Sequence, residues 1–154
     1  MKSLSFVLAG GMLASLVAAT AAPAQDAETV LKAREAHMTL NGFNLGPLVA
    51  MTRGDIDYDA ELASASAANL AALAAMDQSR LWAPGSGRPD FENSRALPAI
   101  WENFDDVQAK IAGLAEATAA LAPVAGNGLE ALQAAMGPVG QACGACHRTY
   151  RAEE

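Results

Sequence analysis

Apolar residues recur at intervals of three and four along most of the chain, and this spacing is the strongest constraint on its fold. Such intervals place side chains on one face of an α-helix, whereas a strand needs alternation with period two, which no segment sustains. The stripe of residues 98–121 is the clearest example: Ile100, Phe104, Val107, Ile111, Leu114, Thr118 and Leu121. The chain has 154 residues, which suits one domain, so the sequence predicts an all-α fold.

Four helical segments follow from these stripes and from end signals in the sequence. The first is expected over residues 26–50 with Asp26 as its N-cap, and the second over residues 57–77. The third begins at Pro98 and stops before Pro123, and the fourth follows Asn127 as its N-cap and continues to Tyr150. Residues 52–55 are predicted to form a turn and residues 82–97 an irregular loop. Short connections between the other helices favour an antiparallel four-helix bundle.

The first 24 residues have the features of a secretory signal. Lys2 precedes an almost wholly apolar segment over residues 4–21, and Ala22-Pro23-Ala24 matches the A-x-A cleavage pattern. We expect cleavage after Ala24, export to the periplasm and a mature domain over residues 25–154, with no membrane span left. The alternative is an uncleaved membrane anchor of borderline length.

The charges exclude some partners. The chain holds 10 basic and 17 acidic residues, a net charge of −7 that becomes −8 when the signal and its single lysine are removed. No basic stripe is present, so nucleic acid is not an expected partner. A redox partner protein steered by charge would present a basic surface.

The sequence Cys143-Gly144-Ala145-Cys146-His147 is the C-x-x-C-H pattern of covalent haem c attachment. Two thiols three residues apart on a helix can form thioethers to one haem, and the next imidazole, His147, can bind its iron as the proximal ligand. Both cysteines lie on the apolar stripe of the fourth segment, so a haem near the C-terminus would enter the bundle. Helical spacing is poor geometry for a Cys143–Cys146 disulfide, and a zinc site would need four ligands, of which only His37 could join.

The first segment offers two side chains for the second face of the iron. Met38 lies on its predicted inner stripe, which is Leu31, Arg34, Met38, Asn41, Leu45 and Leu48. His37 is rotated by about 100° from Met38 and is expected at the flank, partly solvated. A helical methionine more commonly fills a core.

These residues resemble the cytochrome c-prime family, the class II c-type cytochromes. The resemblance rests on the C-terminal motif followed by Arg-Thr-Tyr-Arg, on residues 135–142 before it, and on Pro98-Ala99-Ile100-Trp101. It spans essentially the whole mature chain. The segment Met38-Thr39-Leu40-Asn41-Gly42 is similar to the low-spin branch of the family, in which a methionine binds the iron.

The resemblance implies a periplasmic carrier of single electrons, with His147 and Met38 as axial ligands of one haem c. The alternative is a five-coordinate, high-spin member that binds nitric oxide or carbon monoxide. An enzyme such as a peroxidase is not expected, since lone His37 is the only distal acid-base candidate. Arg34 and Arg151 are expected to contact the haem, Arg34 at a propionate and Arg151 beside His147.

The resemblance and the composition also mark candidate packing surfaces. The candidates for the haem wall are the aromatic residues Trp82, Trp101, Phe104 and Phe43, each of which could equally be packed in the core. A homodimer through the first two helices would use the small-residue face Ala63, Ala67, Ala71 and Ala74. That face could equally be buried inside the bundle.

Overall fold

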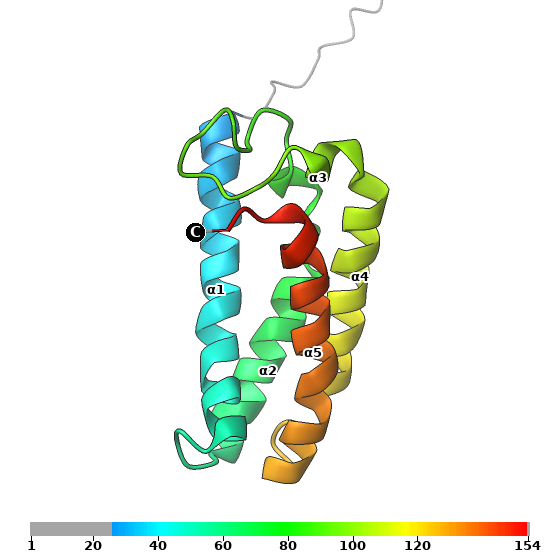
Figure 1. Cartoon of the computed structure of the whole chain (residues 1–154). Helices are drawn as coiled ribbons and strands as arrows, with labels where there is room; N and C mark the ends of the chain where they lie inside the picture. The colour runs from blue at the N-terminus through cyan, green and yellow to red at the C-terminus, as the bar shows by residue number, and fades with distance from the viewer. Residues whose placement is uncertain (1–25, 154) are drawn as a thin grey trace, which may run out of the picture.

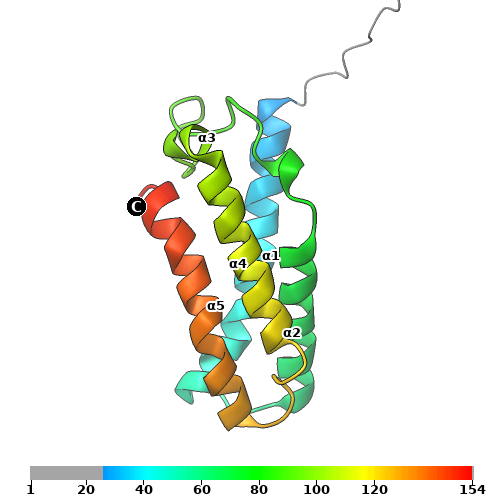
Figure 2. The same cartoon turned by 90° about the vertical axis from the view of Figure 1, so that its right-hand side faces the viewer.

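The chain folds into an antiparallel four-helix bundle, which confirms the predicted fold class (Figure 1). The computed structural model describes residues 26–153. The long helices α1 and α4 run in one direction, and α2 and α5 run in the other (Figure 2). The helical elements are α1 (Ala27–Arg53), α2 (Ala60–Ala75), the 3₁₀ turn η1 (Ser79–Leu81), α3 (Ala99–Glu102), α4 (Phe104–Leu121) and α5 (Leu129–Tyr150).

Helix α1 is longer than expected. It begins where predicted, because the Asp26 side chain accepts a hydrogen bond from the Thr29 amide. It then continues through Pro47 to Arg53, so the end predicted at residue 50 is wrong. The reason is Gly54, whose left-handed conformation (φ 77°) directs its N–H to the carbonyls of the last turn and stops the helix there.

Two other helix starts differ from the sequence-based expectation. Helix α2 begins three residues late because the Asp59 carboxylate accepts the amides of the first turn at 2.9 Å. The third segment is divided at Asn103, whose backbone (φ −131°, ψ 44°) is not helical, so α3 is a separate short helix.

The N-cap of α5 was also predicted wrongly. Gly128, not Asn127, occupies that position, with a φ of 113° that a residue with a side chain would rarely adopt. The side-chain amide of Asn127 instead donates to the carbonyl of Pro123.

Helix packing divides the core into two clusters. The larger joins all four long helices, and the smaller lies under the loop of residues 82–97. Ala63 and Ala67 are fully buried in the larger cluster, and Ala74 is 4% exposed. The small-residue face considered for a homodimer is therefore mostly inside the bundle, where it lets α2 pack closely. The larger cluster contains Leu48, Met51, Ala63, Ala67, Leu70, Leu121, Ala125, Leu132 and Val139.

The loop of residues 82–97 is irregular, as predicted, and is hydrogen-bonded both to α1 and to the C-terminal end of α5. On the α5 side, the Leu97 amide donates to the Tyr150 carbonyl, and the Ala152 amide donates to the Arg95 carbonyl at 2.8 Å. Within residues 26–153, no helix is both long enough and apolar enough to cross a bilayer.

The opposite end of the bundle is closed by short connections. The Tyr58 hydroxyl, just before α2, donates to the Ala125 carbonyl and accepts from the Gly128 amide, both at 2.9 Å. One side chain thereby joins the turn after α1 to the turn before α5.

Candidate functional site

The cysteine–histidine motif lies in the last turns of α5. Cys143, Cys146 and His147 are half-buried, and both cysteines are free thiols. Cys143 packs against the larger core cluster and Cys146 against the smaller one. The helix therefore turns both thiols toward the interior of the bundle, as the stripe predicted.

Burial controls the protonation of all three groups. It raises the pKa of Cys143 and of Cys146. The negative charge of Asp106 raises the pKa of Cys146 further. Burial also lowers the pKa of His147, and the positive charges of Arg151 and Arg95 lower it further. A neutral imidazole is the form that binds a metal, so His147 is ready to act as a ligand at neutral pH.

This donor set fits a haem better than a bare metal ion. Within residues 26–153, no group of three or more His, Cys, Asp or Glu side chains is arranged to hold a metal ion, so a zinc site finds no support there. A haem supplies four ligands through its own ring, so the protein needs to provide only an axial ligand and the points of covalent attachment. Two free thiols and a neutral imidazole meet that requirement.

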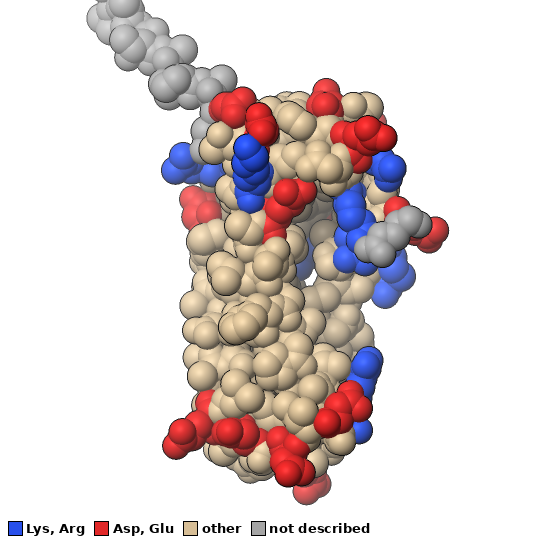
Figure 3. All heavy atoms as spheres, turned by 90° about the vertical axis from the view of Figure 1, so that its left-hand side faces the viewer, with Lys and Arg blue, Asp and Glu red and all other residues tan. Residues whose placement is uncertain are grey.

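The surface is hollowed at the level of the last turns of α5. Figure 3, seen from the α1 side, shows this hollow, with Lys and Arg gathered on one rim and acidic residues mostly at the two ends of the bundle. Arg151 and Arg95 are close enough to His147 to affect its pKa. The expected contact of Arg151 with the haem stays a prediction.

Arg34 is buried and binds the loop, and its expected contact with a haem propionate stays a prediction. Its side chain is 5% exposed and already bound to neutral oxygen atoms of the loop. Nη1 donates to the Leu81 carbonyl at 3.0 Å and to Ser86 Oγ at 2.9 Å, and Nη2 donates to the Ser86 carbonyl and to Ser94 Oγ. The guanidinium carbon also lies 5.2 Å from the centre of a Trp82 ring. Arg34 thus binds the loop of residues 82–97 to α1.

The expectation for the distal pair on α1 was reversed. His37 is buried, with 6% exposure, and its Nε2 lies 3.1 Å from the Leu73 carbonyl of α2. Met38, placed on the inner stripe by the sequence, is 39% exposed. The buried face of α1 passes through Arg34, His37 and Asn44, so the stripe deviates from the prediction by one residue at this turn.

Three of the four aromatic residues expected in the haem wall lie near Cys146. Trp82 belongs to the smaller core cluster, and Trp101 and Phe104 pack against it together with Cys146. Trp101 donates its ring N–H to the Trp82 carbonyl at 2.9 Å. Phe43 is 75% exposed, so its placement in the wall was wrong.

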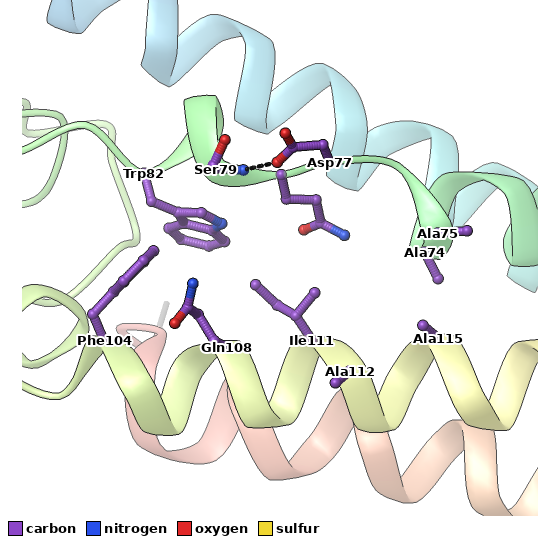
Figure 4. Close-up of a pocket in the computed structure, with 11 residues that line it drawn as sticks. Ala74, Ala75, Asp77, Ser79, Trp82, Phe104, Gln108, Ile111, Ala112 and Ala115 are labelled. Carbon is purple, nitrogen blue, oxygen red and sulfur yellow. Dashed lines mark hydrogen bonds between the residues drawn. The ribbon is translucent and has the colours of Figure 1, made fainter.

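A separate pocket of about 300 Å³ lies between α4 and the segment that follows α2 (Figure 4). Trp82, Phe104 and Ile111 line it, and none of the three motif residues does. Cys146 packs in the same cluster as these three side chains.

The sequence did not reveal two sets of residues that shape the site. One is the pair Ser86 and Ser94, which bind Arg34 from a loop with no regular pattern. The other is the bond from Tyr150 to Asp106, which joins α5 to α4 with an O–O distance of 2.6 Å. The buried arginine on an apolar stripe was the only signal for the first set, and the sequence had none for the second.

Tyr150 should make stability fall at high pH. Its bond to Asp106 raises the pKa of Tyr150 to about 12, above the value near 10 of an unfolded chain. Between these values the folded state keeps a proton that the unfolded state has lost. The stability that this bond adds to the folded state is therefore complete below about pH 10 and is lost as the pH rises toward 12. Urea unfolding across this range should show a steeper decline for the native chain than for Tyr150→Phe, and parallel curves would contradict this.

The comparisons with known proteins agree with one another. A family model described as Cytochrome C′ matches residues 29–151. Two relatives from Cereibacter sphaeroides, a cytochrome c′ and a cytochrome c-554, are each 44% identical over 142 residues, which is 91% of this chain and 95% and 93% of the relatives.

Solved structures give the same result. A cytochrome c′ from Rhodobacter spheriodes is 43% identical with a TM-score of 0.81, covering 84% of this chain and 99% of that one. Another cytochrome c′, described as having an unusual ligand-controlled dimer dissociation, is 31% identical with a TM-score of 0.75, covering 83% and 98%.

Proposed function

The chain belongs to the cytochrome c′ family, and we propose that it is a haem c protein that binds a diatomic gas such as nitric oxide or carbon monoxide on the iron face opposite His147. The family binds haem c covalently, and the two cysteines lie in the matching C-terminal region. When bound, the group supplies an iron that binds gases and exchanges single electrons.

We assign distinct roles to the residues of the motif. Cys143 and Cys146 provide the thioether bonds, and His147 provides the proximal ligand through its neutral ring. Arg151 and Arg95 favour that neutral ring by their positive charge. Trp82 and Phe104 exclude water from the Cys146 side of the group.

The similarity to proteins named cytochrome c′ is the observation that carries the choice of an open iron face. On α1, Met38 is 39% exposed, whereas the adjacent His37 is buried and engaged with α2. We place the Met38 side chain beside the open face as an apolar neighbour of the bound gas.

A second candidate is the electron carrier with Met38 bound to the iron. The pattern from Met38 to Gly42, similar to the low-spin branch, favours it. A filled site would suit outer-sphere electron transfer and would exclude gases until the methionine left. Peroxidase chemistry finds less support, because the His37 ring lies against the Leu73 carbonyl.

The two candidates predict different spectra for Met38→Ala. With an open face, the oxidised native protein is high-spin at neutral pH, and the variant keeps the same spin state. Optical spectra in both oxidation states measure this, and Met76→Ala, at a similarly exposed methionine (43%), is the matched control. A low-spin native spectrum that becomes high-spin only in Met38→Ala would establish the electron carrier instead.

We also propose that the protein is exported to the periplasm with residues 1–24 removed. These residues lie outside the described part of the chain. Removal after Ala24 would leave the first helix and its Asp26 cap intact. The mass of the protein from a periplasmic extract tests this, and retention of the full chain would contradict it.

A homodimer would use the outer face of α1 rather than the buried alanines of α2. Phe43 is 75% exposed and Leu40 49%, three residues apart on that helix. We expect Phe43→Asp to shift a dimer to monomer in sedimentation of the haem-loaded protein, with the spectrum unchanged. A native protein that is monomeric at all concentrations would contradict the dimer.

A further inference from the structure

The chain that leaves α5 is hydrogen-bonded to the end of the loop of residues 82–97. After the last turn of α5 it bends away from the helix axis (Figure 1), and Arg151 forms an isolated antiparallel bridge with Ala96. Beside this bridge, the Ala152 amide donates to the Arg95 carbonyl at 2.8 Å. The end of the chain is therefore attached to a part of the molecule outside its own helix.

The Arg95 side chain completes this pairing. Its Nε and Nη2 donate to the Ala152 carbonyl at 3.0 and 2.8 Å. Arg95 thus binds both backbone groups of Ala152, the amide through its own carbonyl and the carbonyl through its guanidinium. Hydrogen bonds from a charged donor are stronger than those from a neutral one, and Ala152 is only 8% exposed, which limits competition from water.

The pairing begins one turn beyond His147. The last carbonyls of a helix have no partners further along it, so an unsupported helix end frays. Here the His147 carbonyl accepts the Arg151 amide at 3.2 Å, which closes the turn that carries the imidazole. The loop side is also anchored, because Ser94, next to Arg95, accepts a hydrogen bond from Arg34 of α1. The His147 turn is thereby connected to α1 through the loop.

We propose that Arg95 is a positioning residue for His147. By binding the Ala152 carbonyl, Arg95 fixes the last turn of α5 and with it the direction of the imidazole ring. A metal ligand keeps its geometry, to within about 0.5 Å, only where the groups around it hold it in place. The inference rests on the proposed function in taking His147 as the proximal ligand, and it assigns to Arg95 an action through the backbone of Ala152.

The test compares Arg95→Met with the native haem-loaded protein by proton NMR of the oxidised form. The unpaired electrons of the iron shift the resonances of the haem methyl groups, and the spread of these shifts depends on the orientation of the axial imidazole. We expect Arg95→Met to change this spread. Hydrogen exchange of the Ala152 amide should become about 10-fold faster or more, because the pairing opens more readily without the guanidinium.

Two further variants separate position from charge. Arg95→Lys keeps the charge, but an ammonium lacks the rigid pair of donors, so the spread should stay altered. Ala152→Pro removes the amide that donates to the Arg95 carbonyl and leaves the Arg95 side chain in place. Arg151 already has the extended backbone (φ −114°, ψ 129°) that a following proline requires. This variant should therefore change the methyl shifts as Arg95→Met does.

The matched control is Arg88→Met, which removes the same charge from the same loop. The Arg88 amide donates to the Ala96 carbonyl at 2.9 Å, and this backbone bond survives the substitution. The methyl shifts and the exchange of the Ala152 amide should both stay at their native values. Circular dichroism checks that each variant is folded, and Arg95→Lys and Ala152→Pro decide the question where Arg95→Met does not fold.

Three results would overturn the proposal. Unchanged methyl shifts in Arg95→Met would mean that the pairing does not orient the ring, and native shifts in Arg95→Lys would assign the effect to charge. Native shifts in Ala152→Pro beside altered shifts in Arg95→Met would mean that Arg95 acts on the haem directly. The proposed function is judged separately: methyl resonances in the low-spin range in the native protein would contradict an open iron face, whereas the change between variants tests Arg95 in either spin state.

Discussion

Replacing Cys143 and Cys146 together with alanine should abolish covalent haem retention. Both thioether bonds of the proposed attachment are lost, and the His147 bond alone does not survive denaturation. Haem staining after a denaturing gel should fall to background, whereas each single variant keeps one bond and a stained band. Because both thiols are half-buried, alanine is tolerated in the helix and the chain should still fold.

A matched substitution checks that the loss is chemical. Ala142→Ser changes the residue just before the motif and should retain the full stain. Haem that stays with the double variant after denaturation would mean that other residues attach it, and the proposed function would then need a different site.

Replacing Arg34 with methionine should lower the free energy of unfolding by about 2–4 kcal/mol. The change removes four hydrogen bonds from a charged donor and leaves buried oxygen atoms of Leu81, Ser86 and Ser94 without their partner. It also removes the cation from above the Trp82 ring. Urea unfolding of the haem-loaded protein measures this loss, and Arg34→Lys should recover only part of it, because one ammonium cannot reach all four acceptors.

The control for this prediction is Arg53→Met at the exposed end of α1. It should change stability by less than about 0.5 kcal/mol. A loss below about 1 kcal/mol in Arg34→Met would mean that water replaces the guanidinium in the loop and that Arg34 is not the link between α1 and residues 82–97.

Local chemistry explains which parts of the site were predictable. Cys143, Cys146 and His147 are fixed by a short pattern on one helical face, and α5 presents them as the stripe required. The Asp26 cap depends on a residue only three positions away, so it was predictable too. Gly54 acts just as locally, but the predicted turn over residues 52–55 began before it, so the end of the helix was placed three residues early.

The remaining site depended on distant residues. His37 and Met38 differ by one position, and a helix of 3.6 residues per turn can direct either toward a neighbour. The carbonyl of Leu73 on α2 decides between them, and no pattern within α1 contains it. Ser86, Ser94 and Asp106 likewise act through partners 44 to 60 residues away in the chain.

The two ends of the bundle differ in the length of the segments that connect their helices. At the end near Tyr58, residues 54–59 join α1 to α2 and residues 122–128 join α4 to α5. At the end that holds the cysteines, the longer segment of residues 76–98 joins α2 to α3, and it is held through Arg34 and through the bond from Arg95 to Ala152. Loop-closure entropy grows with loop length, so this longest connection should be ordered late in folding. We therefore expect the cysteine end to stay open while the hairpins are already built, which leaves an interval for a large planar cofactor to enter before the loop closes.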